Sequence, residues 1–283
     1  MKIVLSGVEI INKGAELMLY AILQEIERKF PKSVVYLPCL AAKRGLDYIN
    51  TSLELKKKPY TTLINIFNNY YIMRVIQKLR LPRLFLTDSY VIPNADYFID
   101  ASGFHFSDQF KYDSFQVAYW EKILSGYHKQ GTKIIFLPQA FGPIKLESTK
   151  KLIQLLNKYS DLIMPREQIS YNYILNSGIS MDKVHLFPDF TSLVKGCVRD
   201  KYSHLVGAVC IIPNMRMIDK GVITKIQYID YIHTIISAIR SKGYTPYILN
   251  HEGRVDEQLS YECVKGASDS VEVITNINAL DVK

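Results

Sequence analysis

The sequence predicts an α/β protein with parallel sheets. Three stretches, at 133–144, 160–175 and 184–191, begin with short apolar and β-branched residues and end abruptly in Pro and small or polar residues. Buried parallel strands that end at a binding crevice have this pattern. The stretches recur at intervals of about 25 residues, which leaves room for a helix to cross over between strands. Gln139, Arg166 and Asp189 follow the three strands, so we expect them to converge on one edge of one sheet.

The N-terminal part of the chain alternates strand and helix patterns throughout. A strand at 3–6 and a loop at 7–13 precede a helix at 14–30, which Pro31 ends because proline cannot continue a helix. The other predicted strands are 34–37, 97–99, 134–137, 162–164 and 184–187, and the other predicted helices are 120–130, 148–158 and 168–176. This alternation predicts βαβ units around a parallel sheet.

A second α/β unit is expected after a basic, irregular connection at 195–204. It contains strands at 206–212, 245–249 and 271–274 and a helix at 226–242. We therefore expect two domains, at 1–198 and 205–283. A helix pattern starts directly after the last strand and stops at Lys283, so the second domain is expected to be incomplete.

The composition is that of an ordinary globular protein. With 283 residues, of which 48% are hydrophobic and 22% charged, the chain is long enough for two α/β domains and unlike disordered or fibrous proteins. Its four cysteines are scattered without a C-x-x-C spacing, which predicts a reduced protein without structural zinc. No metal and no other cofactor is expected. The sequence shows neither a signal peptide nor an apolar stretch of about 20 residues, so we expect a cytoplasmic protein.

The positive charge of the chain is concentrated in one segment. Between Ala41 and Arg83, nine Lys and Arg residues stand against Asp47 and Glu54, which gives +7 of the total net charge of +8. The segment is also aromatic and has helical spacing. It could rest on the anionic inner face of a membrane, or be a solvated insertion whose apolar residues pack on the core. No nucleic-acid motif accompanies it, so no nucleic-acid partner is expected.

Polar and glycine residues at the ends of the predicted strands are candidates for a binding site. Gly14 lies in a strand–loop–helix whose helix N-terminus could hold a phosphate, although turn and cap roles are the more common explanation for the residues of such a loop. Gly103 would let the backbone turn closely, and His105 and Asp108 could do acid–base work, although a lone histidine is more often merely hydrogen bonded. Gln139, close to Gly142-Pro143, would offer an amide at a rigid turn.

Two charged residues suggest anion binding and proton transfer. Arg166 suits a carboxylate or phosphate because guanidinium is planar and always charged, while the alternative is a salt bridge to Glu167 or Asp161. Asp189 could orient a hydroxyl or a base, or only cap the next turn. His251 lies in a loop before a predicted helix. It could contact a substrate there, or it could only cap the helix.

Taken together, these segments resemble the polysaccharide pyruvyl transferase family. The matching motifs are GTKIIFLPQAFGPI, the D-x-I-x-x-R-E-x-x-S stretch from Asp161 to Ser170, VHLFPD, IIPNMRM at 211–217 and LNHEGRVDEQL at 249–259. The first loop with Asn12-x-Gly14 and the stretch ASGFHFSD fit the first and third strands of the family. The resemblance extends over essentially the whole chain and implies two Rossmann-like domains arranged as in GT-B glycosyltransferases.

The resemblance also implies an activity. Members transfer the enolpyruvyl part of phosphoenolpyruvate to sugar hydroxyls of a glycan or lipid-linked precursor, which gives a cyclic pyruvate ketal. Asp189 and His105 would then be catalytic residues. The expected substrate-binding residues are Arg166, Gln139, Gly103, Asn12, Gly14, Asn214 and His251.

Three departures from the family pattern qualify this expectation. The first loop has Lys13-Gly14-Ala15-Glu16 where N-x-G-D is common, and Ser102-Gly103-Phe104-His105 replaces a run of glycines. The Arg-x-His segment of the family would lie beyond Lys283, so a chain that ends there is expected to be impaired. The alternatives are a GT-B-like glycosyltransferase that uses a nucleotide sugar, and a non-catalytic paralogue.

Overall fold

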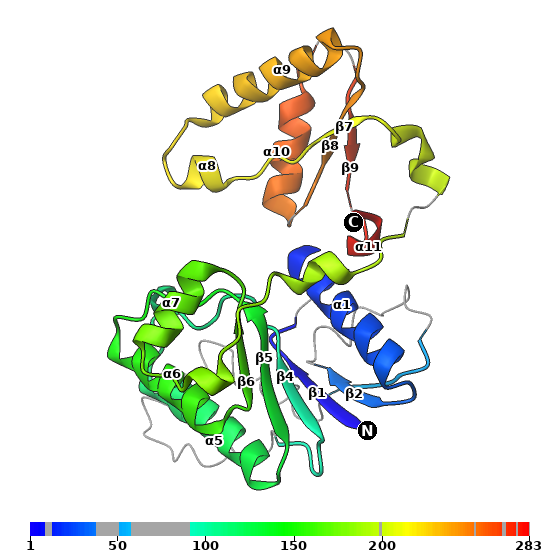
Figure 1. The fold of residues 1–283 in the computed structure, drawn as a ribbon. Coiled ribbons are helices and arrows are strands. Elements are labelled where there is room, and N and C mark those ends of the chain that lie inside the picture. The colour runs from blue at the N-terminus through cyan, green and yellow to red at the C-terminus, as the bar shows by residue number, and fades with distance from the viewer. Residues whose placement is uncertain are drawn as a thin grey trace, which may run out of the picture. The chain divides into compact units, whose positions relative to one another are not determined.

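The computed structural model describes residues 1–8, 13–37, 51–57, 91–197, 200–251, 253–267, 270–275 and 277–282. The chain forms two compact units, of which the first comprises Met1–Ile10 and Met18–Leu193 and the second comprises Ile11–Leu17 and Val194–Lys283. Each unit contains a parallel β-sheet with helices packed on it (Figure 1). The prediction of an α/β protein with parallel sheets is confirmed.

The sheet of the first unit has six strands in the order β3-β2-β1-β4-β5-β6, and every neighbouring pair is parallel. The strands are β1 (Lys2–Ser6), β2 (Val34–Leu37), β3 (Glu54–Lys57), β4 (Tyr97–Asp100), β5 (Lys133–Gln139) and β6 (Leu162–Pro165). The strand order reverses between β1 and β4, where Ser6 lies opposite Asp100. In open parallel sheets, ligands bind outside the carboxyl ends of the strands beside such a reversal.

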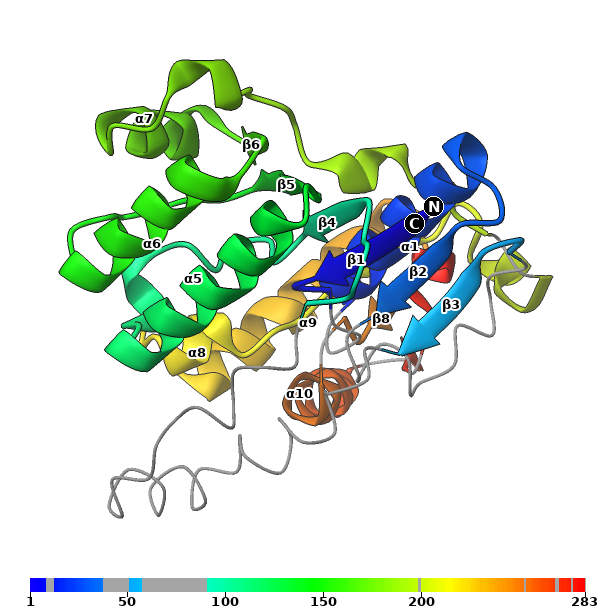
Figure 2. The same ribbon diagram turned by 90° about the horizontal axis from the view of Figure 1, so that it is seen from below.

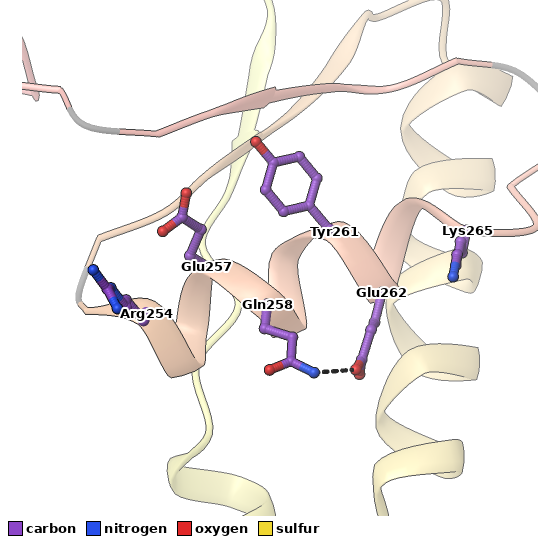
Figure 3. A pocket seen from close by; sticks show the side chains of 6 residues that line it. All are labelled: Arg254, Glu257, Gln258, Tyr261, Glu262 and Lys265. Carbon is purple, nitrogen blue, oxygen red and sulfur yellow. Dashed lines mark hydrogen bonds between the residues drawn. The ribbon is translucent and has the colours of Figure 1, made fainter.

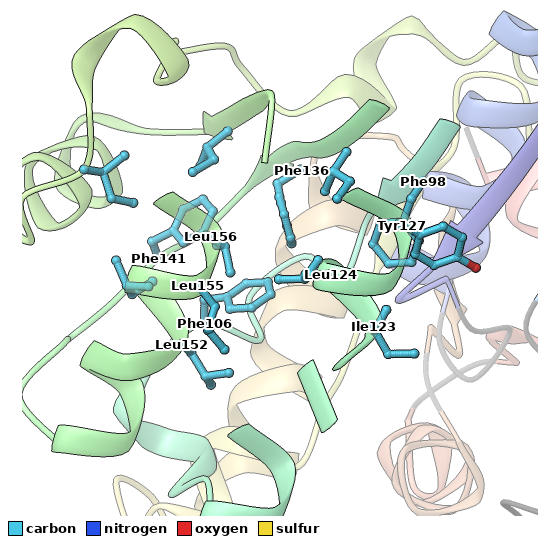
Figure 4. Packing of buried hydrophobic residues seen from close by; sticks show 14 of the residues in the cluster. Phe98, Phe106, Ile123, Leu124, Tyr127, Phe136, Phe141, Leu152, Leu155 and Leu156 are labelled. Atoms are coloured by element: carbon cyan, nitrogen blue, oxygen red, sulfur yellow. The ribbon is translucent and has the colours of Figure 1, made fainter. Parts of the chain in front are cut away.

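Helices cover both faces of this sheet. The helix α1 (Lys13–Lys29) lies on one face, and α5 (Ser114–Lys129) and α6 (Glu147–Tyr159) lie on the other (Figure 2). Alternate residues of β1 serve the two faces, since Ile3 and Leu5 pack with α1 whereas Val4 packs with the opposite core. That opposite core is rich in aromatic and leucine side chains from α5, α6, β4 and β5 (Figure 4).

Two helices begin where a capping box satisfies their first backbone N–H groups. The helix α5 starts before its predicted range because Asp113 accepts a hydrogen bond from Gln116 N at 2.8 Å and Gln116 accepts one from Asp113 N at 2.9 Å. Thr224 and Gln227 form the same arrangement at the start of α9 (Lys225–Ser241). The prediction missed the first of these signals because the apolar spacing becomes regular only farther along the helix.

Part of the basic segment 41–83 belongs to the sheet. Residues 54–57 form β3, which pairs with β2 and places Leu55 opposite Val35. The description of this part as an insertion was therefore wrong, because one short edge strand carries too few apolar residues to stand out. The rest of 41–83, apart from 51–53, lies outside the described residues. Among the described residues, no helix combines the length and apolar character that a membrane crossing requires.

The stretch 184–187 runs beside β6 with little regular pairing. It makes one bridge, between Ile163 and Val184, and two backbone hydrogen bonds, from His185 N to Ile163 O and from Phe187 N to Pro165 O, both 3.1 Å long. The predicted strand here is thus reduced to an extended segment. This segment still carries the chain to the end of β6, where Asp189 follows.

The second unit has a three-stranded parallel sheet in the order β7-β8-β9. Its strands are β7 (Val209–Ile211), β8 (Pro246–Leu249) and β9 (Glu272–Ile274), and its helices besides α9 are α8 (Arg216–Asp219), α10 (Arg254–Val264) and α11 (Ala279–Val282). Residues 200–205 form a 3-10 helix, which corrects the prediction of an irregular connection there. The first turn of α1 belongs to this unit, and Asn278 Nδ2 donates to Glu16 Oε1 at 2.9 Å.

The tight approach of β1 and β4 predicts that Gly7→Ala destabilises the fold. Gly7 has φ +73, and a Cβ there would lie 2.2 Å from Ser102 Oγ and 2.5 Å from the Ser102 backbone. We expect the free energy of unfolding to fall by about 3 kcal/mol or more, measured by urea denaturation. Gly131→Ala is the matched control, since Gly131 has φ +78 and nothing within 4 Å, and should cost only about 1–2 kcal/mol. Equal losses in the two variants would contradict this account.

Candidate functional site

The carboxyl ends of β4, β5 and β6 bring the predicted site residues of the first unit to one edge of the sheet. Asp100 ends β4, Gln139 ends β5, and Arg166 follows β6 directly. Gln139 lies opposite Pro165 in the ladder, and its carbonyl accepts a hydrogen bond from Arg166 N at 3.0 Å. The parallel pairing therefore places these polar groups side by side.

Asp100, Ser102 and Gln139 form a buried polar cluster. The Asp100 carboxylate accepts hydrogen bonds from Ser102 Oγ at 2.8 Å, from Ser102 N at 3.1 Å and from Gln139 Nε2 at 3.3 Å. Among the described residues, Gln139 Oε1 is buried without a hydrogen-bond partner, which is costly for an amide oxygen. The prediction missed Asp100 and Ser102, although the polar D-x-S at the end of a strand was a usable signal.

Arg166 lies between two carboxylates. Its Nε donates to Glu167 Oε2 at 3.2 Å, and its Nη1 donates to Asp189 Oδ2 at 3.3 Å. Asp189 Oδ1 accepts from Thr191 N at 3.0 Å and from Thr191 Oγ1 at 2.8 Å. The Arg166 side chain keeps 32% of its surface exposed, and these bonds use two of the five N–H donors of a guanidinium.

The contacts of Arg166 show which of the two expected salt bridges forms. Arg166 does pair with Glu167, as one reading of the sequence proposed. Asp161, the other proposed partner, instead binds Lys133 Nζ at 2.7 Å and Ile134 N at 2.8 Å. Burial alone would raise the pKa of Asp161, but these two donors lower it below its usual value. The two carboxylates beside Arg166 fix the position of the guanidinium at the sheet edge.

The loop after β4 carries Gly103 and His105. Gly103 has φ +78, and its carbonyl accepts from Ala140 N at 2.8 Å, which ties this loop to the end of β5. The His105 ring packs edge-on against Phe110, with ring centroids 5.0 Å apart. Tyr112 donates its hydroxyl to His105 O at 2.8 Å, and burial, with the nearby Asp100 carboxylate, raises the pKa of Tyr112 to about 12.

Asp108 has a structural role at this edge. Its carboxylate accepts from Lys145 N at 2.7 Å and from Leu146 N at 3.1 Å, directly before α6. Burial works to raise the pKa of Asp108, but the two backbone donors outweigh it and lower the pKa below its usual value. The structure therefore assigns Asp108 a capping role in place of the expected acid–base role, and this role depends on residues 37 and 38 positions away in the chain.

Two of the predicted residues lie at the carboxyl edge of the second sheet. Asn214 follows β7 and accepts from Arg216 N at 3.0 Å, while His251 follows β8. Asp256 Oδ1 accepts from Met215 N at 2.9 Å, which joins the first turn of α10 to the loop after β7. Gly14 lies in the first turn of α1, and Asn12 lies outside the described residues.

Two hollows of the second unit involve α10. One of about 290 Å³ lies between the loops after β7 and β8, with Arg216 and Arg254 in its lining. Another of about 480 Å³ lies along α10, and Gln258 Nε2 donates to Glu262 Oε1 at 3.3 Å in its lining (Figure 3). Neither lining contains Asn214 or His251. In the part of the chain that the structure describes, no group of three or more His, Cys, Asp or Glu side chains is arranged to hold a metal ion.

Solved structures similar to this chain are sugar-nucleotide proteins at 11–13% sequence identity. The UDP-GlcNAc 2-epimerase of Methanocaldococcus jannaschii has 12% identity and a TM-score of 0.54 over 100% of this chain and 75% of its own. That of Neisseria meningitidis bound to UDP-GlcNAc has 11% identity and a TM-score of 0.51 over 100% and 74%. Anabaena Alr3699/HepE in complex with UDP and glucose has 13% identity and a TM-score of 0.50 over 100% and 71%. These likenesses show the GT-B-like fold alone.

The sequence itself identifies the family. No curated protein matches the chain. The model of the polysaccharide pyruvyl transferase family matches residues 12–278, nearly the whole chain. The chain therefore belongs to this family of transferases, which assigns it to pyruvyl transfer onto polysaccharide. The resemblance to this family and the GT-B-like fold that it implies are confirmed.

The capping role of Asp108 predicts a pH-dependent loss of stability in Asp108→Ala. We expect the free energy of unfolding to fall by about 1–2 kcal/mol at pH 7, because two backbone N–H groups lose their acceptor. A lowered pKa means that the stabilisation is present at neutral pH and is lost as the pH falls below about 4. The difference between variant and wild type should therefore shrink in acid, as measured by urea denaturation. The control Asp230→Ala, on the exposed face of α9, should change little, and a pH-independent loss in Asp108→Ala would contradict the capping role.

Proposed function

We propose that this member of the polysaccharide pyruvyl transferase family uses phosphoenolpyruvate as donor and forms a pyruvate ketal on two hydroxyls of a saccharide acceptor. The methylene carbon of the enolpyruvyl group gains a proton and becomes a methyl group. Two sugar oxygens form bonds to C2, and the bond from C2 to the phosphate oxygen breaks. The proton that the new methyl group takes up balances the proton lost by one sugar hydroxyl. The proton of the other hydroxyl leaves with inorganic phosphate. The reaction thus needs an anion clamp and a group that accepts a hydroxyl proton.

The observation that carries this proposal is the placement of Arg166. It lies at the carboxyl edge of a doubly covered parallel sheet, partly exposed and fixed by Glu167 and Asp189. A planar guanidinium with N–H groups to spare suits the carboxylate or phosphate of phosphoenolpyruvate. Gln139 supports the clamp, because its carbonyl holds Arg166 N and its amide is anchored on Asp100.

The geometry favours different roles for the two proposed catalytic residues. Both oxygens of Asp189 are engaged, by Thr191 and by Arg166, which suits a residue that positions the clamp. His105 makes no ring hydrogen bond among the described residues, which suits the acceptance of a hydroxyl proton. Gly103 would let the donor approach the backbone. Asn12, Gly14, Asn214 and His251 are proposed as further substrate contacts.

A nucleotide-sugar reaction is the alternative for this fold. Its support is the likeness to UDP-GlcNAc 2-epimerases and to HepE, which is bound to UDP and glucose. Consumption of a UDP-sugar in the absence of phosphoenolpyruvate would favour this alternative over pyruvyl transfer.

The clamp role predicts that Arg166→Lys weakens donor binding. Lysine keeps the charge but loses the planar fork, so the KM for phosphoenolpyruvate should rise about 10- to 100-fold. The measurement is phosphate release in the presence of galactose- or mannose-type acceptors. Arg28→Lys is the matched control, since Arg28 pairs with Glu25 at 2.7 Å on the exposed face of α1, and should leave the KM unchanged. An unchanged KM in Arg166→Lys would contradict the clamp.

Substitutions of His105 and Asp189 are expected to change different kinetic parameters. His105→Asn should lower kcat about 100-fold or more with little change in the KM for phosphoenolpyruvate, because it removes the proton acceptor. Asp189→Asn should act mainly on this KM, because it loosens Arg166. Steady-state kinetics of both variants decide the assignment. A large loss of kcat in Asp189→Asn alone would reverse it.

A further inference from the structure

The loop after β4 carries an aromatic surface that neither the clamp nor the proton acceptor explains. Phe104, His105 and Phe110 pack against one another, with centroid distances of 6.1 Å for Phe104–His105, 5.6 Å for Phe104–Phe110 and 5.0 Å for His105–Phe110. Phe104 is 48% exposed, whereas Phe106, two residues later, is fully buried. The core is therefore filled by Phe106, and packing does not account for Phe104.

Hydrogen bonds anchor the backbone of the loop that carries these rings. On one side of Phe104, the carbonyl of Gly103 accepts from Ala140 N at 2.8 Å. On the other side, the carbonyl of Phe106 accepts from Gly142 N at 2.9 Å, and Tyr112 binds the carbonyl of His105. An aromatic side chain on a backbone anchored in this way loses less freedom when a ligand covers it than one on a mobile loop would.

We propose that Phe104 and Phe110 form the platform on which a pyranose ring of the acceptor stacks. One face of a pyranose ring consists largely of C–H groups, which carry partial positive charge and pack on the negative face of an aromatic ring. The hydroxyls at the edge of the sugar then point toward polar neighbours, and the His105 ring contacts both phenylalanine rings. This inference rests on the proposed function, since it locates the acceptor at the same sheet edge as Arg166.

The chemistry of the surface favours a saccharide over the donor. Phosphoenolpyruvate is small and highly charged, so it gains little from an apolar ring. A sugar combines an apolar face with a polar edge, and the loop offers the matching combination of two phenyl rings and an imidazole. A protein partner would also cover exposed aromatic rings, and the experiment below separates the two.

The test uses the whole protein and three methyl glycosides, those of galactose, mannose and N-acetylglucosamine. Saturation-transfer NMR and titration measure their binding without any donor. We expect at least one glycoside to bind the wild type, with saturation transfer strongest at its C–H protons. Phe104→Ala should weaken this binding about tenfold, and Phe104→Leu should weaken it nearly as much because leucine lacks the ring. Thermal melts confirm that both variants fold.

The matched control is Phe30→Ala. Phe30 follows α1 and is 41% exposed, with its ring stacked on Tyr97 at the start of β4. It should leave glycoside binding unchanged, and Phe104→Ala should leave the KM for phosphoenolpyruvate unchanged. Unaltered glycoside binding in Phe104→Ala, full binding in Phe104→Leu, or no glycoside binding by the wild type would overturn the platform. Failure of the wild type to release phosphate from phosphoenolpyruvate would instead overturn the proposed function, because glycoside binding is measured without it.

Discussion

The arrangement of the candidate site depends on the parallel pairing of β4, β5 and β6, with Gln139 at its centre. The side-chain amide of Gln139 binds the buried Asp100 carboxylate, and its backbone carbonyl binds Arg166 N. One fully buried residue thus connects the end of β4 with the residue that follows β6. Because every pair in the sheet is parallel, these strand ends can only meet at one edge.

Electrostatic balance at this edge explains why a cation is stably held there. The guanidinium of Arg166 has two carboxylates within hydrogen-bond distance, so its position is fixed without a bound ligand. In the proposed clamp, an arriving anion would need only the remaining N–H donors and would not have to order a long side chain first.

The sequence predicted the features that depend on local pattern. The apolar strands that end in polar residues placed Gln139 and Arg166 at the correct strand ends, and the motifs led to the correct family. It did not predict β3, because a short edge strand such as ELKK has no apolar run. The roles of Asp100 and Asp108 were also missed, since both depend on contacts with residues 37–39 positions away in the chain. Long-range hydrogen bonds of this kind leave no periodic signal in a sequence.

The central claim is that this sheet edge serves pyruvyl transfer from phosphoenolpyruvate to a sugar. The most direct measurement is NMR of a reaction with phosphoenolpyruvate labelled with ¹³C at C2. The account predicts that the label moves to a carbon bonded to two sugar oxygens, with one inorganic phosphate released for each ketal formed. Recovery of the label only in phosphoenolpyruvate or free pyruvate, while a UDP-sugar is consumed in a parallel reaction, would contradict it.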